Sequence, residues 1–128
     1  MNTHFNKQVD KNIFLKTSWD ILEKYYDAMN CNKLEEVMSL IHSNSPVQIP
    51  TRQLLGQLMS NYKLNNELLL TYYVGAYNDY IFIRMKQKTI KLEGPEFKNN
   101  ITDSIVAMKQ DDGEWKIWSM MPLQTNFF

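Results

Sequence analysis

The sequence predicts an α+β fold in which three helices are followed by about four antiparallel strands. Two observations predict it. Apolar residues recur at helical spacing from about residue 19 to residue 62, whereas from Glu67 onward the chain is rich in the Leu, Tyr, Thr, Val and Ile that strands favour. No internal repeat or linker divides the 128 residues, and this length can bury one core. We therefore expect a single domain over residues 1–128, with residues 1–16 as an N-terminal extension.

The composition argues against several classes of protein. Fourteen basic and fourteen acidic residues cancel and no basic block occurs, which argues against a nucleic-acid partner. No apolar run approaches the roughly 18 residues of a membrane helix, and no signal-peptide stretch is visible. The single cysteine, Cys31, rules out an internal disulfide and suits a reducing compartment. We expect a cytoplasmic protein with no membrane partner.

The first helix is expected to begin near Thr17. Thr17 and Asp20 resemble a capping box, in which two side chains satisfy the free backbone donors of a helix start. The buried stripe of this helix consists of apolar side chains at helical spacing: Trp19, Leu22, Tyr26 and Met29, widened by Ile21 and Tyr25.

Two shorter helices are expected to follow. Asn32 is predicted to cap the second, which has Glu35 at its third position and His42 in its last turn. Pro46 and Pro50 then interrupt the chain, and Thr51 is predicted to cap the third helix. The inward side chains of that helix are expected to be Leu54, Leu55, Leu58, Met59 and Tyr62.

Four strands are expected, separated by residues typical of tight turns. Gly75 suggests a bulge or bend within a strand over residues 68–77. Asn78-Asp79 predicts a two-residue turn into a strand over residues 80–91, and Gly94-Pro95 predicts the next reversal. The last two strands, over residues 99–110 and 114–121, are joined by Asp111-Asp112-Gly113 and followed by a short apolar tail.

Both faces of the predicted sheet are apolar. Helices can cover only one face, yet apolar residues occupy consecutive strand positions, as in Ile81-Phe82-Ile83 and Ile105-Val106-Ala107-Met108. An antiparallel sheet with one solvated face would alternate instead. An identical subunit is the simplest cover for the second face. The pattern therefore predicts a homodimer packed through the outer face of the sheet.

Two parts of the sequence resemble the nuclear-transport-factor-2-like superfamily, which includes ketosteroid isomerases and polyketide cyclases. They are Tyr25-Tyr26-Asp27-Ala28-Met29-Asn30 followed by Asn32-Lys33-Leu34-Glu35-Glu36, and Gly94-Pro95-Glu96-Phe97 with Asn100, Asp103 and Asp112-Gly113-Glu114-Trp115-Lys116-Ile117. The resemblance implies a cone-shaped α+β barrel, with three helices on a strongly curved antiparallel sheet of about four to six strands. It also implies a pocket between the two layers and dimerisation through the outer sheet face.

The resemblance further implies where catalytic residues would lie, and two of the three are missing. In ketosteroid isomerases a tyrosine and a protonated Asp form an oxyanion hole, and another Asp is the general base. Tyr25 falls at the tyrosine position, but Ile49 and Ile105 stand where the two acids would be. Without a carboxylate base, proton abstraction next to a carbonyl has no agent. We therefore expect no catalytic residue of this kind.

Two charged residues within apolar surroundings leave alternatives open. Asp79, Arg84 and Asp103 are similar to the Asp-Arg-Asp set of limonene-epoxide-hydrolase-like members, although Asp79 also fits a hairpin turn. Arg84 lies in the middle of a strand, where a buried charge needs a partner. It can anchor an anionic ligand, pair with Asp103, or lie in solvent or in the dimer interface.

The sequence does not predict a metal site or a cofactor. His4 and His42 are far apart, and Cys31 has no partner at ligand spacing. A nucleophilic Cys31–His42 pair is conceivable, but a packing cysteine at a helix end is the commoner case.

We expect a homodimer that binds a small apolar or anionic molecule in a tyrosine-lined pocket. Trp115 and Trp118 have opposite strand parity, so one should face the pocket or the helices and the other the dimer face. The alternatives are an enzyme of the cyclase, isomerase or hydrolase type using Tyr25 with Asp103 and Arg84, and a structural module whose cavity is filled by side chains. The candidate pocket-lining residues are Trp19, Tyr25, Tyr26, Met29, Tyr72, Arg84, Asp103, Trp115 and Trp118.

Overall fold

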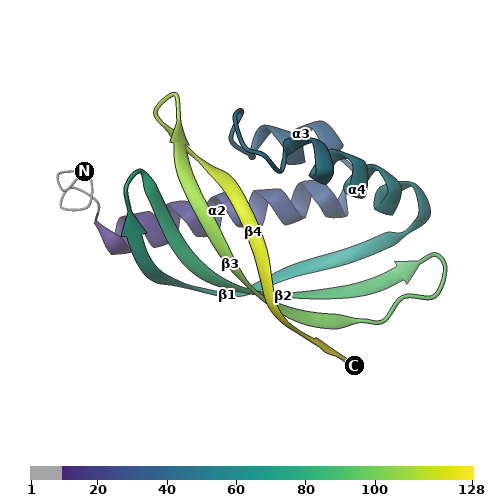
Figure 1. Ribbon diagram of the computed structural model, residues 1–128. Helices are drawn as coiled ribbons and strands as arrows, with labels where there is room; N and C mark the ends of the chain where they lie inside the picture. Colours follow the sequence, from purple (N-terminus) through teal and green to yellow (C-terminus); the bar gives the residue numbers. More distant parts are fainter. Residues whose placement is uncertain (1–9) are drawn as a thin grey trace.

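The computed structural model describes residues 10–128, and residues 1–9 lie outside the described part. Three helices pack against one side of a curled, unclosed antiparallel sheet of four strands (Figure 1). The predicted α+β class is therefore confirmed. The elements are α2 (Lys11–Asn30), α3 (Leu34–Ser39), α4 (Gln48–Asn61), β1 (Lys63–Tyr77), β2 (Tyr80–Glu93), β3 (Asn100–Asp111) and β4 (Glu114–Phe127), and the strands neighbour one another in chain order.

Helix α2 begins well before Thr17, so the predicted capping box was wrong. Its N-cap is Asp10, whose carboxylate accepts hydrogen bonds from the backbone N–H groups of Asn12 and Ile13 at 2.9 and 3.0 Å. Residues 11–16 of the expected extension are therefore helical. The added turns bring Phe14 into the core, where its ring meets that of Trp115 edge to face at 4.9 Å between centroids.

The other two helix starts also differ from the prediction. Asn32 does not cap α3; it has a left-handed φ of 57° in the connection from α2, a conformation that Asn tolerates. Helix α4 begins at Gln48 rather than after Thr51. Pro50 fits its first turn because backbone N–H groups there have no helical partner. Leu54, predicted to point inward, is 56% exposed.

His42 lies beyond the end of α3, in a segment that attaches to the edge of β4. The backbone N–H of Ile117 donates to Leu40 at 2.9 Å, and that of His42 donates to Ile117 at 2.8 Å. His42 Nε2 donates to the Gln110 carbonyl and Nδ1 accepts from the Asn44 N–H, both at 3.0 Å. Because both ring nitrogens are engaged, the conceivable pairing of His42 with Cys31 does not form.

The strand connections match the prediction, although the strands are longer. Asn78 and Asp112, each with φ 53°, and Gly113 with φ 84° supply the positive φ angles of the two hairpin turns. Gly94 has φ 122°, and a Cβ there would lie 2.6 Å from the Asn61 carbonyl oxygen, so this reversal requires glycine. The register shifts at Gly75, as its predicted bulge requires. Strand β4 runs through the expected tail to Phe127.

The sheet has an inner face toward the helices and an outer face away from them. The inner face carries the buried residues of alternating positions: Ile81, Ile83 and Met85 on β2, Val106 and Met108 on β3, and Ile117 on β4. With Leu22, Tyr25 and Tyr26 of α2 they form the core. Within residues 10–128, no helix has the length and hydropathy that crossing a membrane requires. The cytoplasmic location stays a prediction.

Candidate functional site

A pocket of about 250 Å³ lies between α2, α4 and the inner face of the sheet. We call it the inner pocket. Helix α2 contributes Tyr25, Tyr26 and Met29, which are three of the nine predicted lining residues. The remaining lining residues come from α4, the strands and the β2–β3 connection: Leu58, Leu64, Asn66, Gln87, Thr89, Phe97 and Met120.

One wall of the inner pocket is a chain of hydrogen bonds between uncharged side chains. The Tyr26 hydroxyl donates to Gln87 Oε1, and Gln87 Nε2 donates to Thr89 Oγ1 at 3.0 Å. Thr89 donates to Asn66 Oδ1 at 2.7 Å, and Asn66 Nδ2 donates to Asn30 Oδ1 at 3.1 Å. Asn66 and Thr89 are only 7% and 6% exposed. Because leaving a buried polar group unpaired costs free energy, these hydrogen bonds hold the side chains in place.

Sequence reasoning missed the polar members of this wall, although a signal for them exists. Gln87 and Thr89 continue the alternation that buries Ile83 and Met85 on β2. Polar residues at positions of buried parity must find hydrogen-bond partners or face a cavity. The register pairs Thr89 with Asn66 on β1, which places the two side chains next to each other.

The two tyrosines are held in the protonated form. Their rings meet edge to face with centroids 5.2 Å apart. Burial raises the pKa of Tyr25 to about 12, and burial together with the neighbouring Tyr25 raises the pKa of Tyr26 well above 10. The Tyr25 hydroxyl forms no hydrogen bond to any residue of the described part of the chain. It therefore remains available as a neutral donor.

Four of the predicted lining residues lie on the outer face of the sheet: Tyr72, Arg84, Asp103 and Trp118. Arg84 pairs in register with Tyr72 on one side and Ile105 on the other, at positions between the buried Ile83 and Met85. Its guanidinium lies 5.7 Å from the centre of the Tyr72 ring and 3.8 Å from the Asp103 carboxylate. The expectation that these side chains line the pocket is thus corrected, because their strand parity turns them away from the helices.

The tryptophans also lie outside the inner pocket. Trp118 packs on the outer face against Tyr80 at 5.6 Å between centroids, with the Lys109 ammonium 4.8 Å from its ring centre. Trp115 lies on the inner face against Phe14, so the two indoles point to opposite faces as their parity predicts. Trp19 is half-buried beside the α2 stripe.

The separation of the two faces decides between the alternatives for Asp103. Tyr25 lies in the inner pocket, whereas Asp103 lies on the outer face and pairs with Arg84 and, at 4.0 Å, with Lys86. Asp79 belongs to the β1–β2 turn. No single site therefore joins Tyr25, Arg84 and Asp103, and the arrangement does not support the enzyme alternative.

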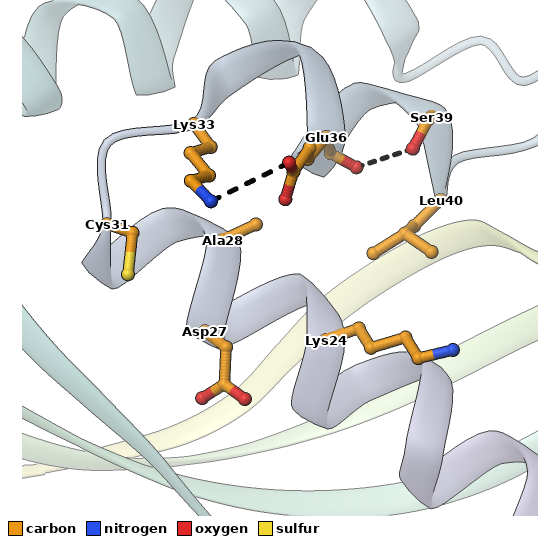
Figure 2. Close-up of a pocket in the computed structure, with 8 residues that line it drawn as sticks. All are labelled: Lys24, Asp27, Ala28, Cys31, Lys33, Glu36, Ser39 and Leu40. Atoms are coloured by element: carbon orange, nitrogen blue, oxygen red, sulfur yellow. Dashed lines mark hydrogen bonds and ion pairs between the residues drawn. The ribbon is translucent and has the colours of Figure 1, made fainter.

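A second hollow, of about 310 Å³, is a groove between α2 and α3 (Figure 2). Lys33 and Glu36 pair in it at 3.8 Å, and Lys24 and Asp27 add one charge of each sign. The exposed thiol of Cys31 lies at its edge. Across residues 10–128, no three His, Cys, Asp or Glu side chains are grouped so as to hold a metal ion.

The fold is similar to that of nuclear-transport-factor-2-like proteins of known structure. It is similar to a proposed scytalone dehydratase from Novosphingobium aromaticivorans, with a TM-score of 0.73 and 12% identity over 91% of this chain and 88% of that chain. A proposed dehydratase of the same fold family from Streptomyces avermitilis has a TM-score of 0.69 and 14% identity over 88% and 98%. The β subunit of benzoate 1,2-dioxygenase from Burkholderia mallei has a TM-score of 0.67 and 9% identity over 81% of this chain and 85% of that chain. Identities this low establish the fold alone.

The sequence itself identifies the family. Residues 20–128 match the family model described as "Anti-sigma-I factor RsgI9, C-terminal domain", and the chain belongs to this family. No curated protein matches it.

Proposed function

We propose that this chain is a small-molecule-binding domain without catalytic activity, and that its ligand occupies the inner pocket. The observation that carries the proposal is the chemistry of the pocket wall. The described residues that line it include no carboxylate, imidazole, thiol, ammonium or guanidinium. Among the described lining residues, only Tyr25 and Tyr26 have titratable side chains, and their raised pKa values keep them protonated. General acid–base catalysis near neutral pH is therefore disfavoured, whereas binding is not.

The family description supports binding rather than catalysis. It names a domain of an anti-sigma factor, which is a regulatory protein by its name. Two of the structural neighbours are described as dehydratases, but the described lining residues of the inner pocket include no carboxylate that could act as a general acid or base.

A fragment screen by ligand-observed NMR tests the proposal. Leu58 of α4 lines the inner pocket, whereas Leu54 of the same helix is exposed. We expect fragments that bind the wild type to lose binding in Leu58→Trp, because the indole fills the pocket, and to retain it in the matched control Leu54→Trp. Circular dichroism checks that both variants fold. The proposal is wrong if no fragment binds, or if the two variants behave alike.

We further propose that the domain forms a homodimer through the outer face of the sheet. Tyr72 and Met121 lie in one row across that face and are 45% and 55% exposed. Phe82 lies in the next row, beside Ala107. Helices leave this apolar surface uncovered, and the fold also occurs in a neighbour that is described as the subunit of a larger enzyme.

Sedimentation velocity at micromolar concentration tests the dimer. Phe82→Glu places a charge in the middle of the outer face and should give a monomer. Ile13→Glu is the matched control, because Ile13 is exposed on α2 away from the sheet. A wild type that sediments as a monomer, or a Phe82→Glu variant that remains a dimer, would contradict the proposal.

A further inference from the structure

We propose that the ligand of the inner pocket is an uncharged molecule that combines an amide or hydroxyl group with a small apolar body. This inference rests on the proposed binding function and adds the chemical class of the ligand. It replaces the expectation of an anionic ligand, because the arginine that was to anchor the anion lies on the outer face.

The surroundings of the pocket disfavour a charged ligand. No described lining residue carries a charge near neutral pH, so a buried ion would lose its hydration without gaining a partner. A hollow of about 290 Å³ shares Tyr26 and Asn66 with the inner pocket, and Glu23, Asp27 and Glu67 line it. These carboxylates disfavour an anion further, and because all three are exposed they offer a cation in the pocket no buried countercharge.

The hydrogen-bonding groups of the ligand follow from the direction of the chain in the pocket wall. Every bond runs the same way, from Tyr26 through Gln87 and Thr89 to Asn66. The Tyr26 oxygen, which begins this hydrogen-bond chain, can therefore still accept a hydrogen bond. Within the described residues, Gln87 keeps a second N–H without a partner, and the Tyr25 hydroxyl forms no hydrogen bond. A ligand group that both donates and accepts hydrogen bonds, such as an amide or an alcohol, matches these donors and this acceptor.

The apolar body of the ligand follows from the remaining walls and the volume. Met29, Leu58, Leu64, Phe97 and Met120 contribute mainly apolar surface. The volume of about 250 Å³ lies slightly below the range of drug-sized small-molecule sites, about 300–1,000 Å³. A body of about one six-membered ring therefore suits the pocket better than a polycyclic one.

Three probes of similar size test the class of ligand by NMR titration: phenylacetamide, phenylacetate and 2-phenylethylamine. We expect the amide to bind at least about tenfold more tightly than either ion, because neither ion finds a countercharge. The inference is overturned if phenylacetate or 2-phenylethylamine binds as tightly as the amide.

Variants of Gln87 show whether the wall makes this choice. Gln87→Glu should weaken binding of the amide and strengthen binding of 2-phenylethylamine, whereas Gln53→Glu on the exposed side of α4 should change neither. Gln87→Met, which keeps the length but removes both hydrogen-bonding groups, should also weaken amide binding and serves if the Glu variant does not fold. Unchanged amide binding in a folded Gln87 variant overturns the inference.

The same titrations separate failure of this inference from failure of the proposed function. If charged probes bind best and Leu58→Trp abolishes their binding, the pocket is functional and only the ligand class is wrong. If the probes fail, charged hits in the fragment screen overturn the class, and an empty screen overturns both proposals.

Discussion

The inner and outer faces of this sheet satisfy their polar groups in different ways. On the inner face, neutral side chains of Asn66, Gln87 and Thr89 bond to one another beside a pocket. On the outer face, Arg84 and Lys86 share the Asp103 carboxylate at 3.8 and 4.0 Å among partly exposed apolar side chains. Neutral pairs suit a buried site, because burying charges is far more costly. The contrast supports a ligand on the inner face and a protein partner on the outer face.

The largest expected difference between the faces lies in their contribution to stability. Ile83→Ala on the inner face should cost about 2–5 kcal/mol, because Ile83 is fully buried and its loss leaves a cavity. The same change at the half-buried Ile105 of the outer face should cost about 1 kcal/mol. Urea denaturation measures both values.

The two costs are expected to depend differently on protein concentration. If the outer face forms the dimer, the cost of Ile105→Ala includes lost association and rises with concentration. The cost of Ile83→Ala has no such reason to rise. Equal costs for the two variants would show that the faces are buried alike.

The next effect concerns alkaline stability and belongs to the inner face. The pKa of Tyr25 is about 12 in the folded protein against a model value of 10.0. The folded state thus keeps a proton that the unfolded chain releases, so the contribution of Tyr25 is present below pH 10 and is lost as the pH rises toward 12. Two pKa units correspond to roughly 3 kcal/mol.

Denaturation of the wild type and Tyr25→Phe between pH 9 and pH 12 measures this contribution. The wild type should lose stability more steeply with rising pH than the variant. Tyr77→Phe is the control, because Tyr77 is 69% exposed and should leave the slope unchanged. Parallel curves for the wild type and Tyr25→Phe would mean that the pocket does not desolvate the phenol.

A smaller effect is expected from the hydrogen-bond chain. Thr89→Val keeps the shape but leaves Asn66 Oδ1 and one Gln87 N–H without their partners, at a cost of about 1–3 kcal/mol. Thr125→Val is the control: Thr125 is exposed, so a change of less than about 0.5 kcal/mol is expected. Chemical denaturation of both variants measures the two costs. Equal costs would show that the hydrogen-bond chain does not contribute to stability.

Particular residues show how much of the fold the sequence predicts. The hairpin turns at Asn78 and Asp112-Gly113 were predicted because few residues adopt a positive φ at low cost. The helix starts were not predicted, since the apolar stripe expected for α2 begins at Trp19 and leaves out Phe14 and the Asp10 cap before it. Pro50 was taken as a break although the first turn of a helix accepts proline.

The candidate site was predicted in part for a similar reason. Helical spacing placed Tyr25, Tyr26 and Met29 on one side of α2, and the pocket lies there. On the strands, apolar runs such as Ile81-Phe82-Ile83 concealed which parity faces the helices. Register shifts next to Leu69 and Val74 on β1 make parity counting unreliable there. Arg84 and Asp103 were therefore included among the pocket-lining candidates, whereas the structure supports the alternative in which they pair with each other.

The smallest expected effect tests whether the outer face is exposed to solvent. Asp103→Asn removes the carboxylate that Arg84 and Lys86 share. Partly exposed pairs at such distances contribute about 1 kcal/mol or less, and salt screens them. Thermal denaturation of the wild type and the variant at low and high salt should show a small difference that salt removes. The control Glu114→Gln should behave alike, because its pair with Lys116 is also exposed on the Glu side.

A loss above about 2 kcal/mol that salt does not reduce would indicate a buried charge pair. Such a loss at dimer-forming concentration only would place the pair inside the subunit interface, whereas a loss at every concentration would contradict the contrast between the two faces.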